Sequence, residues 1–174
     1  MPRPFHPQIR KKDRLRFEEQ LLDHLPRLRR FAHALARNGV DADDLLQASV
    51  ERALQRHEQW EPGTRLDSWM YRLMRNLWID TVRAENRRGE TFVAPDAGDL
   101  IGVDGNQESV VELGKVGAAL RRLPPDQREA VALVVIEGFA YKEAAEILDI
   151  PIGTLTSRLV RGREALMARL GEAA

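Results

Sequence analysis

Four side chains with hydrogen-bonding groups recur at helical spacing near the C-terminal end of the sequence, namely Thr154, Ser157, Arg158 and Arg161. At about 100° per residue they share one face of a helix, and no carboxylate joins them before Glu164. Hydroxyl and guanidinium groups in this arrangement suit base edges and phosphates, because an arginine can donate two hydrogen bonds to a guanine. The chemistry that this face predicts is recognition of nucleic acid.

Two short helices must position this face. The same helical pattern carries leucines on its opposite side, and a first helical pattern precedes it, before the break Asp149-Ile150-Pro151. A polar and basic helix held across another helix by a three-residue turn is the arrangement by which helix-turn-helix proteins place side chains in a major groove. The pattern also fits an amphipathic helical hairpin whose basic face is merely solvated. The leucines are Leu155, Leu159, Leu166 and Leu170.

A second set of residues suited to nucleic acid lies further upstream. After the turn segment Trp60 to Asp67, a helix is predicted from Asp67 or Ser68 to about Glu85, with one apolar side. Its other side interleaves aromatic and basic groups, which suit unstacked bases and phosphates together. The alternative is that Trp69, Tyr71 and Trp78 simply belong to the core. The interleaved residues are Tyr71, Arg72, Arg75, Trp78, Ile79 and Arg83.

The composition excludes several classes of protein. The 174 residues are 43% hydrophobic and 31% charged and contain no cysteine, which excludes disulfides and thiolate metal sites. The longest purely apolar run, Ala130 to Ile136, is far too short to span a membrane, and the N-terminus lacks the apolar core of a signal peptide. We therefore expect a cytoplasmic protein without membrane insertion.

An enzyme is not indicated. The four histidines are scattered, and no set of histidines and carboxylates has metal-ligand spacing. The sequence also has no glycine-rich phosphate loop and no nucleophile elbow. We expect no catalytic residue, metal, cofactor or small-molecule substrate.

The predicted fold class is all-α, with two small helical domains. Residues 1–13 are rich in proline and basic groups and are expected to form a flexible arm. Residues 14–88 form the first domain, in which Asp41 is expected to cap the second helix. Residues 89–112 contain six acidic and no basic side chains and are interpreted as a flexible linker. Residues 113–174 form the second domain, which includes the helix-turn-helix.

Both halves carry motifs of a known family. The first half contains Asp44-Leu45-Leu46-Gln47 and the run Ser68 to Asp80, followed by Arg83, Arg87 and Arg88. The second half contains Leu123-Pro124-Pro125-Asp126-Gln127-Arg128-Glu129, the run Tyr141 to Leu148, and Pro151-Ile152-Gly153-Thr154-Leu155. In this order they resemble the extracytoplasmic-function (ECF) group of bacterial sigma factors, which keeps only sigma regions 2 and 4. The sequence also resembles the general-stress branch of that group.

The resemblance implies a protein that binds core RNA polymerase, recognises the promoter minus-thirty-five and minus-ten elements, and promotes transcription initiation under the control of an anti-sigma factor. Core polymerase would contact Asp44, Gln47 and Glu51. The opened minus-ten element, with a base flipped from the stack, would contact Trp60, Arg65, Asp67, Trp69, Arg72, Arg75, Asn76, Trp78, Arg83, Arg87 and Arg88. The minus-thirty-five element would contact Thr154, Thr156, Ser157, Arg158, Arg161 and Arg163.

Two departures from the family pattern bear on stability. Ala140 stands where a serine or threonine usually caps the first helix of the helix-turn-helix, and Gly162 replaces a common alanine. Each is expected to cost about 1 kcal/mol, through the lost cap and through the low helix propensity of glycine. The competing interpretation of the whole chain is a two-domain DNA-binding regulator that does not act through core polymerase.

Overall fold

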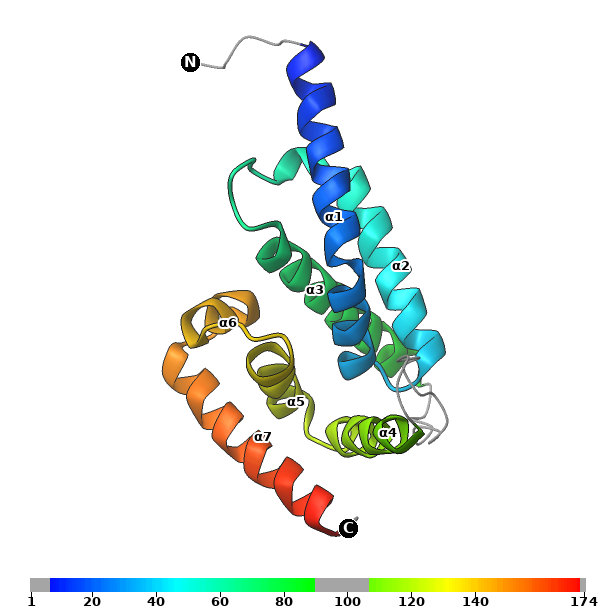
Figure 1. Ribbon diagram of the computed structural model, residues 1–174, viewed down its shortest axis with the longest axis vertical. Helices are drawn as coiled ribbons and strands as arrows, with labels where there is room; N and C mark the ends of the chain where they lie inside the picture. Colours follow the sequence, from blue (N-terminus) through cyan, green and yellow to red (C-terminus); the bar gives the residue numbers. More distant parts are fainter. Residues whose placement is uncertain (1–6, 90–106, 173–174) are drawn as a thin grey trace.

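The structure is a computed structural model that describes residues 7–89 and 107–172. Within these ranges the secondary structure is entirely helical, which confirms the predicted all-α class. The described N-terminal half contains helices α1 to α3, and the described C-terminal half contains helices α4 to α7, which lie below them in Figure 1. Most of the predicted linker lies outside the described residues.

Helix α1 (Pro7–Leu35) begins earlier than the sequence predicted. The expected arm extended to residue 13, but residues 7–13 continue the helix, and residues 1–6 lie outside the description. The segment from Gln8 to Arg16 contains no glycine or proline and is rich in arginine and lysine, which are good helix formers. The helix also continues through Pro26, where the ring removes one backbone donor.

Asn38, rather than Asp41, caps helix α2 (Gly39–Gln55). The side-chain oxygen of Asn38 accepts a hydrogen bond of 2.8 Å from the backbone N–H of Asp41. Asn38 therefore starts the second helix. A short 3-10 turn (His57–Gln59) follows, and helix α3 (Leu66–Arg88) ends at Gly89 with a φ of 70°, a left-handed conformation that glycine adopts without strain.

The C-terminal half begins with helix α4 (Gln107–Arg121) and helix α5 (Pro125–Val131). Helix α5 runs directly into a π-helical turn, η2 (Ala132–Ile136), in which the N–H of Glu137 donates to the carbonyl of Ala132 over 2.9 Å. Gly138, with a φ of 74°, then reverses the chain. Helices α6 (Tyr141–Leu148) and α7 (Ile152–Glu172) form the predicted helix-turn-helix.

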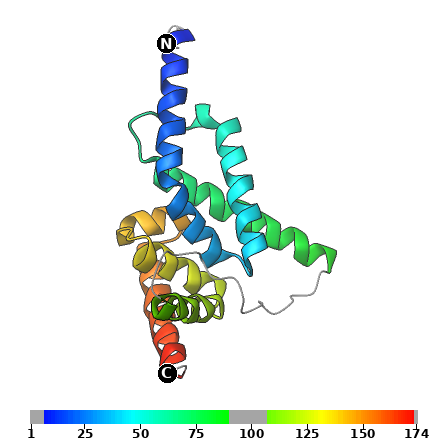
Figure 2. The same ribbon diagram turned by 45° about the vertical axis from the view of Figure 1, so that its right-hand side comes forward.

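The two halves share one hydrophobic core. Tyr71 of α3 lies between Phe31 of α1 and Phe139 of the η2–α6 loop, with ring centroids 4.8 and 4.9 Å apart. All three rings are buried in a cluster that continues from α1 into α5, α6 and α7. Helix α6 lies beside the N-terminal end of α3, and α5 lies near the lower end of α1 (Figures 1 and 2). The halves are therefore packed together rather than separated.

Gly162 lies at the closest approach between α5 and α7. A Cβ atom at this position would meet Cγ2 of Val131 at 2.8 Å and the carbonyl oxygen of Gln127 at 3.1 Å. The missing side chain lets the long helix α7 pack directly on α5. The glycine that the sequence presented only as a weak helix former therefore has a packing role.

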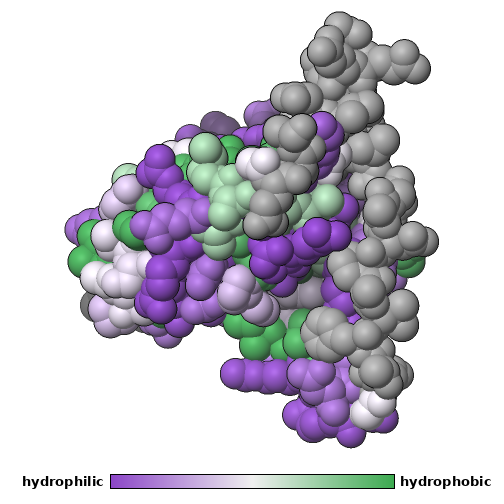
Figure 3. Space-filling model, turned by 90° about the horizontal axis from the view of Figure 1, so that it is seen from below, coloured by the Kyte–Doolittle hydropathy of each residue, from purple (hydrophilic) through white to green (hydrophobic). Residues whose placement is uncertain are grey.

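Figure 3 shows one face of the molecule coloured by hydropathy. Seen from below, it interleaves hydrophilic and hydrophobic residues (Figure 3). Among the described helices, none combines the length and the apolarity needed to cross a bilayer.

Candidate nucleic-acid and polymerase interfaces

Helix α7 presents the residues expected to recognise duplex DNA. Leu155 and Leu159 are buried against the rest of the helix-turn-helix, which turns the opposite face outward. The turn contains Asp149 in the left-handed conformation (φ 53°), a conformation that aspartate tolerates better than most residues. Along the outward face and its edges, Thr156, Ser157, Arg161 and Arg163 are exposed and Thr154 and Arg158 are half-buried.

Arg158 forms an ion pair at the edge of this face. Its Nε lies 3.4 Å from a carboxylate oxygen of Asp126 at the start of α5. An ion pair with a half-exposed carboxylate is weak in water and can be exchanged for a contact with DNA. Arg161 is exposed, and its Nε donates to the carbonyl of Ser157 over 3.3 Å.

The residues expected to contact the minus-ten element differ in their exposure to solvent. On α3 and its flanks, Arg65, Arg72, Asn76, Arg83, Arg87 and Arg88 are exposed, whereas Trp69 and Arg75 are half-buried. Trp60, Asp67 and Trp78 are buried, with exposed fractions of 5, 6 and 9%. Trp60 packs on Phe17, and Trp78 lies 6.0 Å from the guanidinium of Arg37. These three side chains build the core beneath the surface rather than forming an open stacking platform.

A groove beside α3 gathers several of the exposed residues. It has a volume of about 330 Å³, and Trp69, Arg72 and Asn76 line it together with Arg52 and Arg56. The two additional arginines come from the end of α2, and Gln59 joins them from the following turn. Sequence reasoning missed all three. Arg52 and Arg56 are spaced i, i+4, but only the tertiary fold shows that they face α3.

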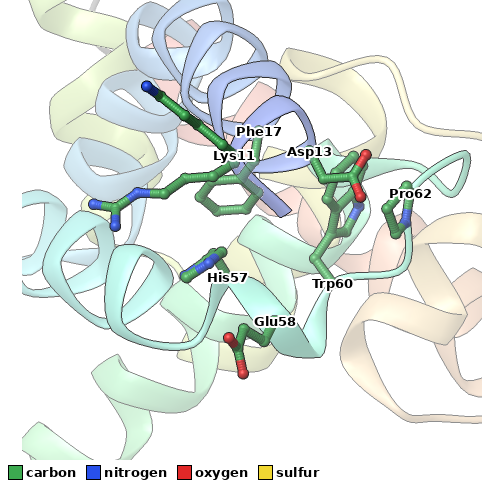
Figure 4. A pocket seen from close by; sticks show the side chains of 8 residues that line it. Lys11, Asp13, Phe17, His57, Glu58, Trp60 and Pro62 are labelled. Atoms are coloured by element: carbon green, nitrogen blue, oxygen red, sulfur yellow. The ribbon is translucent and has the colours of Figure 1, made fainter. Parts of the chain in front are cut away.

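A larger cavity of about 600 Å³ opens on the other side of the Trp60 loop, between that loop and α1. Figure 4 shows Phe17, His57 and Trp60 around it, with Lys11 and Asp13 on the α1 side. Phe17 links the rings, because its centroid lies 6.1 Å from His57 and 5.7 Å from Trp60. The indole N–H of Trp60 is buried and has no acceptor among the described residues.

Arginines of α3 and its N-terminal flank are engaged by the C-terminal half. Arg65 forms an ion pair with Glu143, and Arg75 Nε lies 3.2 Å from Glu129 Oε2. Arg72 donates a hydrogen bond of 2.8 Å to the backbone carbonyl of Glu146. Three of the residues expected to hold promoter DNA, Arg65, Arg72 and Arg75, therefore have partners in the C-terminal half.

Burial and ion pairing shift the pKa of two carboxyl groups near these arginines in opposite directions. Burial raises the pKa of Glu129, although the charge and hydrogen bond of Arg75 oppose the change. For Asp67 burial also acts to raise the pKa, but hydrogen bonds from the Arg65 side chain and the Ser68 N–H hold the pKa below its ordinary value. Asp67 thus fixes Arg65 in place instead of facing outward.

The order of these elements matches a known pair of conserved regions. The family model for Sigma-70 region 2 matches residues 21–88, and the model for Sigma-70, region 4 matches residues 113–166. The chain is 39% identical over 152 residues to the ECF RNA polymerase sigma factor EcfG of Rhodopseudomonas palustris, a match that covers 87% of this chain and 83% of that one. The chain belongs to the ECF sigma factors.

Two further relatives support this assignment. The chain is 34% identical over 154 residues to the ECF RNA polymerase sigma factor SigE of Mycolicibacterium smegmatis, over 86% of this chain and 60% of that one. It also resembles the sigma factor RpoE in a co-crystal structure with the anti-sigma factor NepR from Bartonella quintana, with a TM-score of 0.79 and 31% identity over 89% of this chain and 96% of that one. ECF sigma factors bind core polymerase and promoter DNA and are not enzymes.

The face of α2 expected to contact polymerase is open in this ECF sigma factor. Asp44, Gln47 and Glu51 are exposed on one side of the helix, away from the buried Leu45 and Ala53. Gln47 donates a hydrogen bond of 3.1 Å to the carboxylate of Glu51, which orders the two polar groups. Arg65, Arg72 and Arg75, by contrast, contact the C-terminal half.

Proposed function

We propose that this ECF sigma factor contacts its partners through three surfaces. The exposed residues of α2 (Asp44, Gln47 and Glu51) dock on core polymerase. The groove between α2 and α3, including Arg72 and Asn76, holds the opened minus-ten strand, and the outward face of α7 reads the minus-thirty-five element. The observation that carries the proposal is the exposure of a polar and basic α7 face above a buried leucine face.

The α2–α3 groove has the chemistry that single-stranded DNA requires. Arg52, Arg56 and Arg72 supply positive charge for phosphates, and the half-buried ring of Trp69 supplies a surface for stacking. Base–aromatic stacking contributes about 1–3 kcal/mol per base, which offsets the few kcal/mol that unstacking costs. Arg83, Arg87 and Arg88 extend the basic surface along α3. The cavity between the Trp60 loop and α1 is large enough to receive a flipped base, and Phe17, His57 and Trp60 line it.

Regulation by an anti-sigma protein is the second part of the proposal. The structural relative from Bartonella quintana was solved with an anti-sigma factor, and this chain matches 96% of its length. We infer a partner of the same kind for this chain, acting in the cytoplasm, where core polymerase is found. Isolation of the native protein from its own cells followed by mass spectrometry of bound proteins tests this part.

Run-off transcription with purified core polymerase on a genomic promoter library tests the main proposal. New start sites that share two spaced upstream motifs are expected only when the sigma factor is present. Arg161→Ala should then relax one position of the upstream motif, whereas Arg122→Ala, which removes an exposed arginine at the end of α4, should leave the motif unchanged. Loss of all transcripts with either variant would contradict the assignment of α7.

A further inference from the structure

The first turns of α1 carry a cluster of basic side chains that the core does not use. These turns extend past the ends of α2 and α3 in both ribbon views (Figures 1 and 2). From residue 11 to residue 16, four basic side chains are exposed, and the one acidic side chain, Asp13, is half-buried. Exposed cations at this density attract phosphates. The basic residues are Lys11, Lys12, Arg14 and Arg16.

Helical spacing divides these cations between two faces of α1. Lys11 and Arg14, spaced i, i+3, share one face and line the cavity between α1 and the Trp60 loop. Lys12 and Arg16, spaced i, i+4, share another face, and neither of them lines that cavity. Two of the four cations therefore belong to the cavity, and the other two provide a matched comparison on the same helix.

The interior of the cavity has the chemistry of a nucleobase site. Phe17 and Trp60 are buried and His57 is half-buried, so that three aromatic rings form its wall. Nδ1 of His57 lies 3.0 Å from the carbonyl oxygen of Leu54. In the neutral ring Nδ1 therefore donates this hydrogen bond, and Nε2 remains an acceptor. Aromatic faces and an edge acceptor suit a base, but they do not bind the phosphate of its nucleotide.

The charged side chains are separated across the cavity. Figure 4 shows the ammonium group of Lys11 at one end and the carboxylate of Asp13 at the other end, beside Pro62. Carboxylates accept hydrogen bonds from base amino groups, and they repel phosphates. Arg14 pairs with Glu18 over 2.8 Å, but an exposed pair of this kind is weak in water and can be exchanged for a phosphate. The phosphate of a bound nucleotide is therefore expected at the Lys11 end.

The position of the cavity gives the direction of the strand. The α2–α3 groove lies on one side of the Trp60 loop, and the cavity lies on the other. In both ribbon views the N-terminal end of α1 and the C-terminal end of α7 lie at opposite ends of the molecule (Figures 1 and 2). Because α7 is assigned to the upstream element, a strand that crosses the loop from the groove toward α1 runs downstream.

We propose that Lys11 and Arg14 bind the phosphates of the non-template strand immediately downstream of the minus-ten element. This inference rests on the proposed binding of the opened strand to the α2–α3 groove and the cavity beside it. The two side chains position the strand without reading its sequence, because phosphate contacts carry no base information. They should therefore stabilise promoter complexes alike, whatever bases follow the minus-ten element.

The test measures strand binding by the holoenzyme, assembled from purified core polymerase and the full-length chain. The probes are two fluorescein-labelled single-stranded oligonucleotides, followed by anisotropy. One ends at the minus-ten sequence from the run-off transcripts, and the other has two more nucleotides at its 3′ end. Lys11→Ala combined with Arg14→Ala should weaken binding of the longer probe about tenfold, because two charge-assisted contacts are lost. Binding of the shorter probe should stay within about twofold of native.

The matched control combines Lys12→Ala with Arg16→Ala. It removes the same net charge from the same turns of α1, but from the face that does not line the cavity. All four side chains are exposed and alanine is a strong helix former, so both double variants should keep their helical circular dichroism. The control should bind both probes within about twofold of the native holoenzyme. Equal losses with the two double variants would indicate a general charge effect and would overturn the proposal.

Salt dependence distinguishes a phosphate contact from a structural defect. For single-stranded DNA, the logarithm of the affinity falls with the logarithm of the salt concentration by about 0.7 for each phosphate contact. With the longer probe, the combined Lys11→Ala and Arg14→Ala substitutions should therefore reduce this slope by about 1.4. The control should leave the slope unchanged. A weaker affinity with an unchanged slope would show that the two side chains do not contact phosphates.

A third probe, lengthened by two nucleotides at its 5′ end instead, tests the direction of the strand. The Lys11→Ala and Arg14→Ala substitutions should leave its binding within about twofold of native. A loss with this probe and not with the 3′-extended one would overturn the downstream assignment.

Failure of the proposed function is distinguishable from failure of this inference. A native holoenzyme that does not prefer the short probe over a scrambled sequence would refute the binding of the minus-ten strand, and the inference with it. A normal preference for the minus-ten sequence, with the 3′-extended probe bound equally well by the native and the Lys11→Ala and Arg14→Ala holoenzymes, would refute the role of α1 alone.

Discussion

Replacement of Gly162 by alanine should destabilise this protein, although helix propensity alone predicts the opposite. Alanine is favoured over glycine in a helix interior by about 1 kcal/mol. The new Cβ, however, would lie 2.8 Å from Cγ2 of Val131 and 3.1 Å from the carbonyl oxygen of Gln127. Val131 is buried and the carbonyl belongs to α5, so neither atom can move freely. Overpacking of this kind costs about 1–3 kcal/mol, which leaves a net loss of up to about 2 kcal/mol.

Urea denaturation followed by circular dichroism measures this difference in stability. The sign of the change in the urea midpoint shows whether helix propensity or overpacking dominates. Gly171→Ala is the matched control, because it lies on the same helix with no atom within 4 Å of the added Cβ. We expect Gly162→Ala to lower the urea midpoint and Gly171→Ala to leave it unchanged or raise it slightly. A higher midpoint for Gly162→Ala would refute the close packing of α5 and α7.

Other perturbations test the remaining contacts. Arg158→Ala should relax one position of the upstream element, at a cost of about 1–3 kcal/mol in specific binding, and leave the affinity for core polymerase unchanged in a pull-down. Glu51→Ala should weaken that pull-down, whereas the exposed Glu19→Ala on α1 should not. Burial raises the pKa of Glu129, so the stability that this group contributes is present below its ordinary value of 4.5 and is lost as the pH rises through the raised pKa. The urea midpoint of Glu129→Gln should therefore rise relative to that of the native chain as the pH rises. Asp67 has a lowered pKa, so the stability that this group contributes is present above its ordinary value of 3.8 and is lost as the pH falls through the lowered pKa. In acid, the urea midpoint of Asp67→Asn should therefore fall less than that of the native chain.

The sequence by itself determined the helices and the family. The Pro124-Pro125-Asp126 start and the Asp149-Ile150-Pro151 break are local signals that helix boundaries match, and the leucines at helical spacing lie within α7. Local signals suffice here because helix periodicity depends on neighbours three and four residues away. The outward face of α7 could be predicted for the same reason, since the leucines on its other side define which side is buried.

The tertiary structure decided which of the candidate residues are accessible. Trp60 and Trp78 looked suited to stacking on bases, but Phe17 and Arg37 from α1 and its C-terminal flank cover them. Arg52 and Arg56 joined the groove only because α2 packs beside α3. Gly162 looked like a weak point of α7 and proved to be a place where α5 packs closely against it. In each case the deciding neighbour is far away in the sequence, beyond the reach of any periodic pattern.

The contact between the two halves depends on the same kind of distant neighbour. Glu137 follows the apolar run Ala130 to Ile136, and nothing in its local pattern indicated partners as remote as Arg27 and Tyr71. The sequence contains 27 basic and 27 acidic side chains. Pairing of those charges within the chain depends on how the helices pack, because a carboxylate and an arginine attract each other wherever folding brings them together.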